Sequence, residues 1–433
     1  MTTMTSPATL PPGPTAPRAV QGAYALTQPL RGMRRLKERY GDAFTVNVPI
    51  FGNAVVISGA AEIKQLFTSG PELADNLEVN LGRVLGSRSM FALSGDEHKR
   101  QRKLLVPPFH GRRLAAYERI VEEETARELA SWPEDKAFAT LPSMMRITLN
   151  AILRAVFGAE GAEFAELREL LPPFVTLGSR LAVLPIPKRG RFNPWRRFER
   201  MRREYDAIVD RLIAKARADG NDRDDVLSMM LQTRYDDGSG LSREEISDQL
   251  LTLLTAGHET TATTLAWAVE RLRRHPALLA ELHEDDGKLL DATILEVQRT
   301  RPVIDLTARQ VKQDGFQLGR WTLPKGYAVL VSIALIHDDD AVFPHAATFD
   351  PHRFAGARPD LYQWIPFGGG TRRCLGAAFA TMEMTVVLRT LLRDFTLVPT
   401  DEPDERWHSR GVAYAPAKGG RAIVRRRTTG GDS

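Results

Sequence analysis

The chain has 433 residues, a net charge of +5, 43% hydrophobic residues and 26% charged residues. These values are typical of a globular protein in water, and no apolar run approaches the ~20 residues needed to cross a bilayer. A single cysteine excludes an intrachain disulfide and fits a reducing compartment. The basic runs lack interleaved aromatic residues, which argues for a solvated surface and against a nucleic-acid site.

The sequence contains no internal repeat and no long linker, so we expect one domain. Residues 1–29 read as a flexible arm without the basic and apolar regions of a secretory signal. Residues 30–427 form the predicted domain, and 428–433 a flexible tail. Helical periodicity dominates this domain, with strand-like segments in a minority. The early helices are expected over 30–40, 60–67, 97–105, 112–131, 143–157, 162–171 and 195–218, with strands over 44–48 and 54–57.

Prolines interrupt the helical pattern at 172–173 and at 185–187. Because proline removes a helical hydrogen bond, we expect a break there. The short apolar segment between them, 174–184, is therefore predicted to be a mobile cap.

The longest helical pattern begins at a capping box, Ser242 to Glu245, and stops before Pro276. A shorter helix over 291–301 follows, and a β-rich part comes after it. In that part we expect strands at 316–318, 329–333 and 396–398. A terminal hairpin is expected from 411–416 and 421–425, turning at 418–420.

The only cysteine lies in the segment IPFGGGTRRCLG, residues 365–376. Cys374 sits where a glycine-rich loop leads into a helix, and free amide groups and the helix dipole at that position lower a thiol pKa. A thiolate there would serve as a metal ligand or a nucleophile. The alternative is a small buried hydrophobic residue.

The stretch from Phe367 to Gly376 resembles the haem-binding loop of the cytochrome P450 family, Phe-Gly-x-Gly-x-Arg-x-Cys-x-Gly. The resemblance covers nearly the whole chain. It implies the cytochrome P450 fold, mainly α with a minor β region, and haem b (iron protoporphyrin IX) between the long central helix and the helix after the loop. Cys374 would be the axial ligand of the iron. Phe367 in the loop and Ala256 on the long helix are further candidates for haem contact.

The long helix carries the sequence AGHETT, residues 256–261. Glycine is unfavourable in mid-helix, which suggests a close approach or a local bulge there. The family has Ala-Gly-x-(Asp/Glu)-Thr at this place. The resemblance implies that Thr260 hydrogen-bonds bound dioxygen and that Glu259 helps deliver protons. The alternative is a solvated glutamate and a threonine bonded to the preceding turn. His258 reads as a packing or surface residue.

Four basic residues are candidates for the two haem propionates. His98 and Arg102 are four residues apart and share one helix face, and His-x-x-x-Arg is common in the family here. Arg309 and Arg372 match further propionate-contacting positions. The alternative for the first two is a basic surface that also includes Lys99, Arg100 and Lys103.

Glu296 and Arg299 have helical i,i+3 spacing, which alone is typical of a surface ion pair. The family uses Glu-x-x-Arg as a buried pair joined by an arginine from a later loop, and Arg353 is the matching residue. We expect a structural role that supports the cysteine loop.

The resemblance implies a cytoplasmic, monomeric monooxygenase that uses dioxygen and hydroxylates a small apolar substrate. Without a flavin or iron–sulfur domain, electrons would come from a separate ferredoxin or flavodoxin and its NAD(P)H reductase. A basic face with Arg112, Arg113, Arg372 and Arg373 would suit an acidic partner. The pocket candidates are 77–93, 174–184, the long helix and 411–414. A peroxygenase, a haem-based sensor and a haem-free binding protein remain the alternatives.

Overall fold

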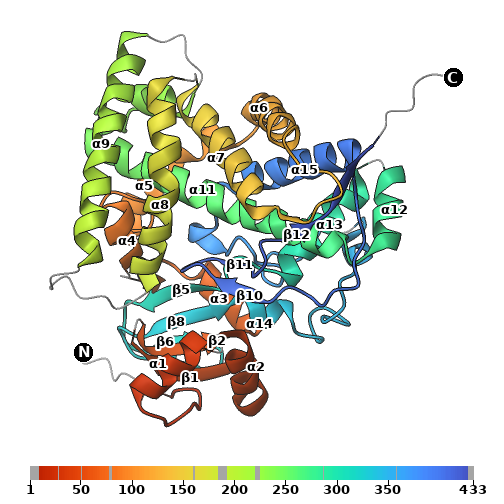
Figure 1. The fold of residues 1–433 in the computed structure, drawn as a ribbon. Helices are drawn as coiled ribbons and strands as arrows, with labels where there is room; N and C mark the ends of the chain where they lie inside the picture. The colour runs from red at the N-terminus through yellow and green to blue at the C-terminus, as the bar shows by residue number, and fades with distance from the viewer. Residues whose placement is uncertain are drawn as a thin grey trace.

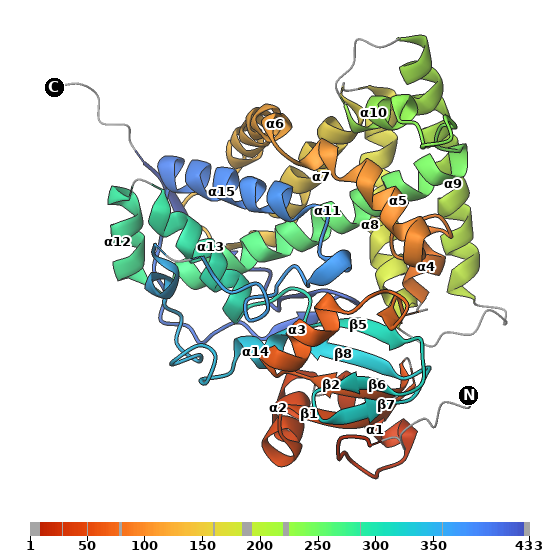
Figure 2. The ribbon, with the colours of Figure 1, turned by 180° about the vertical axis from the view of Figure 1, so that it is seen from behind.

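The computed structural model describes residues 9–427, except 28, 50, 78–79, 159–160, 184–192, 220–224, 286 and 357. A large helical part lies on one side and a smaller β-rich part on the other (Figure 1; Figure 2 shows the opposite side). The mainly α architecture expected from the sequence is thereby confirmed. No helix in the described ranges has the length and apolar character needed to cross a bilayer.

The helices and strands follow one another along the chain, and a long irregular segment separates α14 from α15. The helices are α1 Arg18–Thr27, α2 Pro29–Tyr40, α3 Ala60–Thr68, α4 Asn80–Leu85, α5 Gly95–Leu105, α6 Arg112–Leu129, α7 Leu141–Phe157, α8 Ala162–Val183, α9 Pro194–Ala218, α10 Val226–Gln232, α11 Arg243–Leu272, α12 Pro276–Glu284, α13 Lys288–Thr300, α14 Ile333–His337 and α15 Ala377–Asp394. The strands are β1 Ala43–Val48, β2 Gly52–Ile57, β3 Ala74–Asp75, β4 Phe138–Ala139, β5 Leu306–Val311, β6 Phe316–Leu318, β7 Trp321–Leu323, β8 Ala328–Ser332, β9 Phe395–Leu397, β10 Trp407–Ser409, β11 Tyr414–Pro416, β12 Arg421–Ala422 and β13 Val424–Arg426.

Helix α11 is the centre of the helical part, packed against α7, α15 and β11. The predicted capping box is present: Ser242 Oγ accepts from the Glu245 amide, and the Glu245 carboxylate accepts from the Ser242 amide. Most of its residues are buried on every side, as expected of a core helix. It is α-helical throughout, so the local bulge suggested by Gly257 is absent.

The main sheet has the strand order β1-β2-β8-β5-β3. Strand β8 pairs parallel to β2 and antiparallel to β5, in the register that places Arg309 opposite Val329. Both views draw β5 between β8 and the helical part. The strand that carries Arg309 therefore faces the helices.

The arm that the sequence predicts to be flexible is ordered where it is described. Residues 18–27 form α1, and Thr9 exchanges two backbone hydrogen bonds with Thr322, of 3.1 and 2.9 Å. The Pro12 carbonyl accepts from the Thr45 amide, and the Gln21 side chain accepts from the Asn47 amide. These contacts tie the arm to the sheet. Residues 1–8 and the expected tail, 428–433, lie outside the described residues.

Helix α8 runs through Pro172 and Pro173, so the break predicted there is wrong. Its continuation packs on α9, where the Phe174 ring stacks on Phe198 at a centroid distance of 4.6 Å. Burial of this aromatic pair offsets the lost helical hydrogen bonds. The expected mobile cap, as far as Ala182, is therefore a packed helix, and Leu184 lies outside the described residues.

The predicted terminal hairpin is also wrong. Strand β11 pairs with β10, and β12 pairs with β4 instead of β11. The Glu405 carboxylate accepts hydrogen bonds from the Lys418, Gly420 and Arg421 amides. Because this side chain takes up the backbone donors at the turn, the two segments diverge to different partners.

Candidate active site

The cysteine loop turns sharply beneath α3. Gly368 and Gly370 have φ angles of +63° and +65°, which favour glycine. A Cβ on Gly370 would lie 2.3 Å from the Phe67 carbonyl oxygen, so only glycine fits there. The Cys374 amide donates to the Phe367 carbonyl at 2.9 Å, which closes the loop just before α15.

Cys374 has solvent-accessible surface, although protein atoms surround its sulfur. The sulfur therefore lines a recess below the molecular surface. Burial raises the pKa of this thiol, while the Gly376 amide, Arg102 and Arg373 act in the opposite direction. The sequence predicts a lowered pKa, and for the protein alone that is wrong because desolvation of the anion outweighs the helix terminus. The amide and the two arginines still favour a bound thiolate.

Helix α11 has an accessible stripe in an otherwise buried surface. Ala256 is exposed, and Thr260, one turn later, is half-buried. The Thr260 hydroxyl donates to the Ala256 carbonyl at 2.7 Å. This bond to the preceding helical turn is the structural alternative expected for Thr260. The hydroxyl oxygen keeps its lone pairs for a further donor.

Glu259 is buried and pairs with Arg410, with 2.8 Å between Oε1 and Nε. Arg410 lies in the turn between β10 and β11, 151 residues further along the chain. The solvated alternative for Glu259 is therefore wrong. His258 is buried, with Nδ1 3.0 Å from the Leu254 carbonyl oxygen, which confirms its expected packing role.

The four basic candidates meet at one place. His98 and Arg102 come from α5, Arg309 from β5 and Arg372 from the cysteine loop. Burial, together with Arg372 and Arg102, lowers the pKa of His98 to about 4. Burial and the Arg372 charge lower the pKa of Arg309 to about 10. His98 and Arg309 are buried, which argues against a purely surface role for this cluster.

One carboxylate, Asp75, balances this cluster among the described residues that influence it. Arg372 Nη2 lies 2.7 Å from Asp75 Oδ1, and the same guanidinium donates to the Met90 and Leu93 carbonyls. Burial alone would raise the pKa of Asp75, but the Gly95 amide and Arg372 lower it on balance. Sequence reasoning missed Asp75, which no motif marks. Three arginines and a histidine thus converge around one acid, and a group with two carboxylates would complement them.

The comparisons with known proteins agree with this arrangement. The cytochrome P450 family model matches residues 10–420. The chain belongs to the cytochrome P450 family. It is 56% identical over 426 residues to cytochrome P450 138 of Mycobacterium bovis, covering 96% of this chain and 97% of that protein. It is 38% identical to cytochrome P450 135B1 of the same organism, covering 97% and 92%.

The fold is shared with solved cytochrome P450 structures. The retinoic acid-bound cyanobacterial CYP120A1 superposes with a TM-score of 0.87 at 25% identity, covering 98% of this chain and all of that one. The haem domain of cytochrome P450DA gives a TM-score of 0.86 at 20% identity, covering 97% and 98%. Membership identifies the chain as a haem-dependent P450 monooxygenase that uses dioxygen and a redox partner.

The residues fit a haem. Cys374 places its sulfur just before the first turn of α15. Arg102, Arg309 and Arg372 supply cations in excess of Asp75, and His98, whose pKa is lowered to about 4, supplies a neutral hydrogen-bonding group. Phe367 is half-buried, with its ring centroid 6.0 Å from that of Trp364. Ala256 and Thr260 supply the accessible face of α11.

This P450 has two buried charge clusters that support the site. In the first, the Glu296 cluster, Arg299 bonds Glu296 through two contacts of 2.7 Å, and Arg353 Nε lies 3.2 Å from Glu296 Oε1. Glu296 and Arg299 are 0% and 1% exposed. The three-residue contact expected from the sequence is confirmed. Arg299 also binds three carbonyls between 337 and 348, upstream of the cysteine loop.

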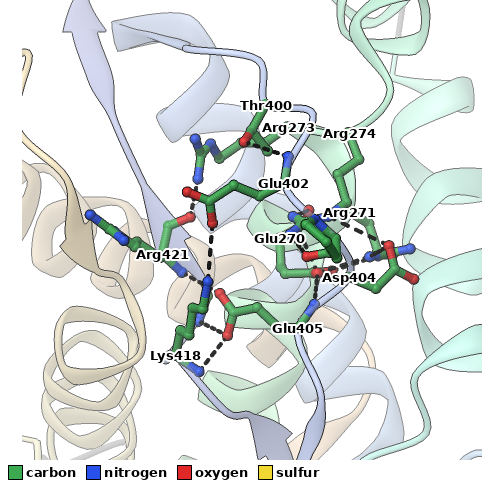
Figure 3. Close-up of polar contacts among 12 residues, drawn as sticks. Glu270, Arg271, Arg273, Arg274, Thr400, Glu402, Asp404, Glu405, Lys418 and Arg421 are labelled. Carbon is green, nitrogen blue, oxygen red and sulfur yellow. Dashed lines mark hydrogen bonds and ion pairs between the residues drawn. The ribbon is translucent and has the colours of Figure 1, made fainter.

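The second, the Glu270 cluster, comprises Glu270, Arg271, Arg274 and Asp404, which Figure 3 labels, together with Arg301, whose Nη2 lies 2.7 Å from Asp404 Oδ2. Arg271 bridges Glu270 and Asp404, with contacts of 2.8 and 2.7 Å through Nη2. The Glu405 amide donates to Glu270 Oε1 at 2.9 Å. This cluster holds residues 403–405 at the end of α11, and Arg273 adds backbone contacts to Thr400 and Arg421. Together these contacts fasten residues 400–421, which include the turn that carries Arg410. Sequence reasoning missed both Arg410 and this cluster. Glu270 and Arg274 have ordinary i,i+4 spacing, and Asp404, Glu405 and Arg410 lie more than a hundred residues from their partners.

Proposed function

We propose that this P450 binds haem b through Cys374 and hydroxylates a small apolar substrate with electrons from a separate ferredoxin or flavodoxin and its NAD(P)H reductase. The observation that carries the proposal is the placement of Cys374, where the Gly376 amide, Arg102 and Arg373 all favour the thiolate. When bound, the haem supplies the oxygen-activating iron, and thiolate ligation favours O–O cleavage. We further propose a cytoplasmic monomer in which 30–427 is one functional domain.

The chain's own residues then have distinct tasks. His98, Arg102, Arg309 and Arg372 hold the propionates, with Asp75 orienting Arg372. Ala256 and Phe367 pack on the haem. The Thr260 hydroxyl lies on the accessible face of α11 and delivers protons to the site where dioxygen binds. Glu259 serves as the carboxylate behind it that relays protons, and Arg410 holds it in place.

The cysteine assignment is tested by the absorption spectrum of the reduced, carbon monoxide-treated protein. Wild type should give the thiolate-type band, and Cys374→Ala should lack it. A normal band in Cys374→Ala would remove the residue from the iron.

Thr260→Ala tests the proton task, with Thr255→Ala as the matched control. Thr255 makes the same kind of bond to the preceding turn, at 2.7 Å to the Leu251 carbonyl, on another face of α11. We expect Thr260→Ala to divert most NAD(P)H-derived electrons to peroxide, while Thr255→Ala stays coupled. Equal coupling in both would remove Thr260 from proton delivery. Turnover on peroxide alone, at the rate seen with the full electron-transfer chain, would favour a peroxygenase instead.

The electron donor is tested at Arg373, which is exposed beside Cys374. The side chain of Arg112 lies outside the described residues. Arg373→Ala should slow reduction by an acidic ferredoxin and leave reduction by dithionite unchanged. Equal slowing by both reductants would mean a disturbed haem site and would argue against docking at this face.

A further inference from the structure

Asp305 immediately precedes β5, the strand of the main sheet that faces the helices. Side chains alternate along a strand, which places Asp305 on the same face as Thr307 and Arg309. The Arg309 guanidinium reaches the Gly369 carbonyl of the cysteine loop, at 3.1 Å, and the Thr307 hydroxyl. The face of β5 that carries Thr307 and Arg309 is therefore directed towards the cysteine loop.

The neighbourhood of Asp305 connects it to the accessible side of α11. The Val303 carbonyl accepts from the Tyr414 amide, and the Tyr414 carbonyl accepts from Trp267 Nε1 on α11. Tyr414 begins β11, just after the turn that brings Arg410 to Glu259. The Asp305 charge contributes, after burial, to the raised pKa of Tyr414, so the two side chains lie within Coulomb range.

Asp305 differs from the other buried carboxyl groups near the site. Glu259 has Arg410, and Asp75 has Arg372. Glu383, on α15, is held neutral by burial, with the Thr261 hydroxyl beside it. The Asp305 carboxylate accepts from its own amide and that of Leu306, and within the described ranges no cation pairs with it.

The protonation state of Asp305 follows from this environment. Burial raises its pKa to about 6, so it is mostly ionised at neutral pH. The residue is half-buried and therefore reachable. A desolvated carboxylate without a cation is costly to hold, and a ligand that brings a positive charge relieves that cost.

We propose that Asp305 anchors a cationic group of the substrate, so that the preferred substrate is an apolar molecule carrying a protonated amine. This specificity rests on the proposed function and narrows its substrate class. An Asp305-bound cation fixes one end of the molecule beside β5 and β11, and the apolar remainder extends along the accessible face of α11.

Two probes of equal chain length test this, the octyltrimethylammonium ion and octanol. The trimethylammonium group has no lone pair, so it cannot ligate iron and be mistaken for an anchored cation. Dissociation constants are measured on the holoprotein by the Soret shift and independently by equilibrium dialysis. We expect wild type to bind the cation about 10-fold more tightly than the alcohol, or about 1.4 kcal/mol.

Asp305→Asn should bring the two affinities to within about twofold of each other. Asp236→Asn removes the same charge from an exposed position and should keep the wild-type preference. If Asp305→Asn binds less haem than wild type, the two dissociation constants are measured on Asp305→Leu instead, which should bind octanol more tightly than the cation. Equal binding of both probes by wild type, no binding of the cation, or an undiminished preference in the Asp305 variants would overturn the proposal. Failure of the proposed function is distinguishable, because the wild-type holoprotein would then lack the thiolate-type spectrum.

Discussion

The Glu296 cluster and the Glu270 cluster have similar contacts, but their members are spaced differently along the chain. Each buries a fully shielded glutamate against arginines and anchors a long irregular segment. The first contains a local Glu-x-x-Arg pair on α13. The second relies on Asp404 and Glu405, more than a hundred residues beyond Glu270. Both clusters contain a local ion pair, Glu296–Arg299 at i,i+3 spacing and Glu270–Arg274 at i,i+4 spacing, so spacing alone singles out neither. The first cluster is recognisable in the sequence because its Glu-x-x-Arg pair also matches a motif of the family.

The two clusters also serve different segments. The Glu296 cluster holds the carbonyls of 337–348, and α13 further binds the residue just before the cysteine loop, because Trp364 Nε1 donates to the Leu295 carbonyl. The Glu270 cluster holds 400–421 and the Arg410 turn. We therefore expect loss of the first to reduce haem retention and loss of the second to loosen the substrate side.

The largest effect is expected for Glu296→Ala. This substitution leaves Arg299 buried without its partner, which lowers the free energy of unfolding by about 3–5 kcal/mol. The measurement is the haem-to-protein ratio together with the urea midpoint. The surface variant Glu281→Ala, which loses only a half-exposed contact to His352, should match wild type. Full haem content in Glu296→Ala would break the distinction between the clusters.

Glu270→Gln should lower the free energy of unfolding by a smaller amount, about 2–4 kcal/mol. The glutamine amide can still accept hydrogen bonds, but Arg271 loses the negative charge beside it. Hydrogen exchange should rise first in 400–421, with haem content close to wild type. If haem loss equals that of Glu296→Ala, both clusters serve the haem site and the comparison fails.

Glu405→Ala should act on the same segment more weakly, by about 1–3 kcal/mol. It leaves the amides of Lys418, Gly420 and Arg421 without their shared acceptor. Proteolysis should show earlier cleavage near 418–421 than in wild type. Glu402→Ala, which removes an exposed contact to the Lys418 side chain, is the control and should cleave as wild type.

The smallest effect is expected for Asp404→Asn, below about 1 kcal/mol, because the carboxylate is 55% exposed and solvent screens it. Burial would raise the pKa of Asp404, but the hydrogen bond and charge of Arg271 lower it on balance. Its contribution is therefore present above the ordinary pKa of 3.8 and is lost as pH falls through the lowered value. The thermal midpoints of variant and wild type should differ at pH 7 and converge in acid. A constant difference would argue against the ionised pair.

Particular residues show how far sequence reasoning reaches. The Cys374 loop, the Ser242 capping box and the Glu296–Arg299 pair are encoded within a dozen residues, and each forms as expected. The helix break at Pro172 is wrong because the Phe174–Phe198 stacking contact overrides a local preference. The terminal hairpin is wrong because Glu405 binds the backbone donors of its turn.

The sequence by itself determined the family and the mainly helical architecture, and it marked Cys374 as the candidate ligand, because those depend on local motifs and periodicity. Only the tertiary structure decided that Arg410 faces Glu259, that Asp75 holds Arg372 and that no cation among the described residues pairs with Asp305. Charge pairing acts through space over a few ångströms, and the chain separations involved, up to 297 residues, leave no local pattern from which to predict it.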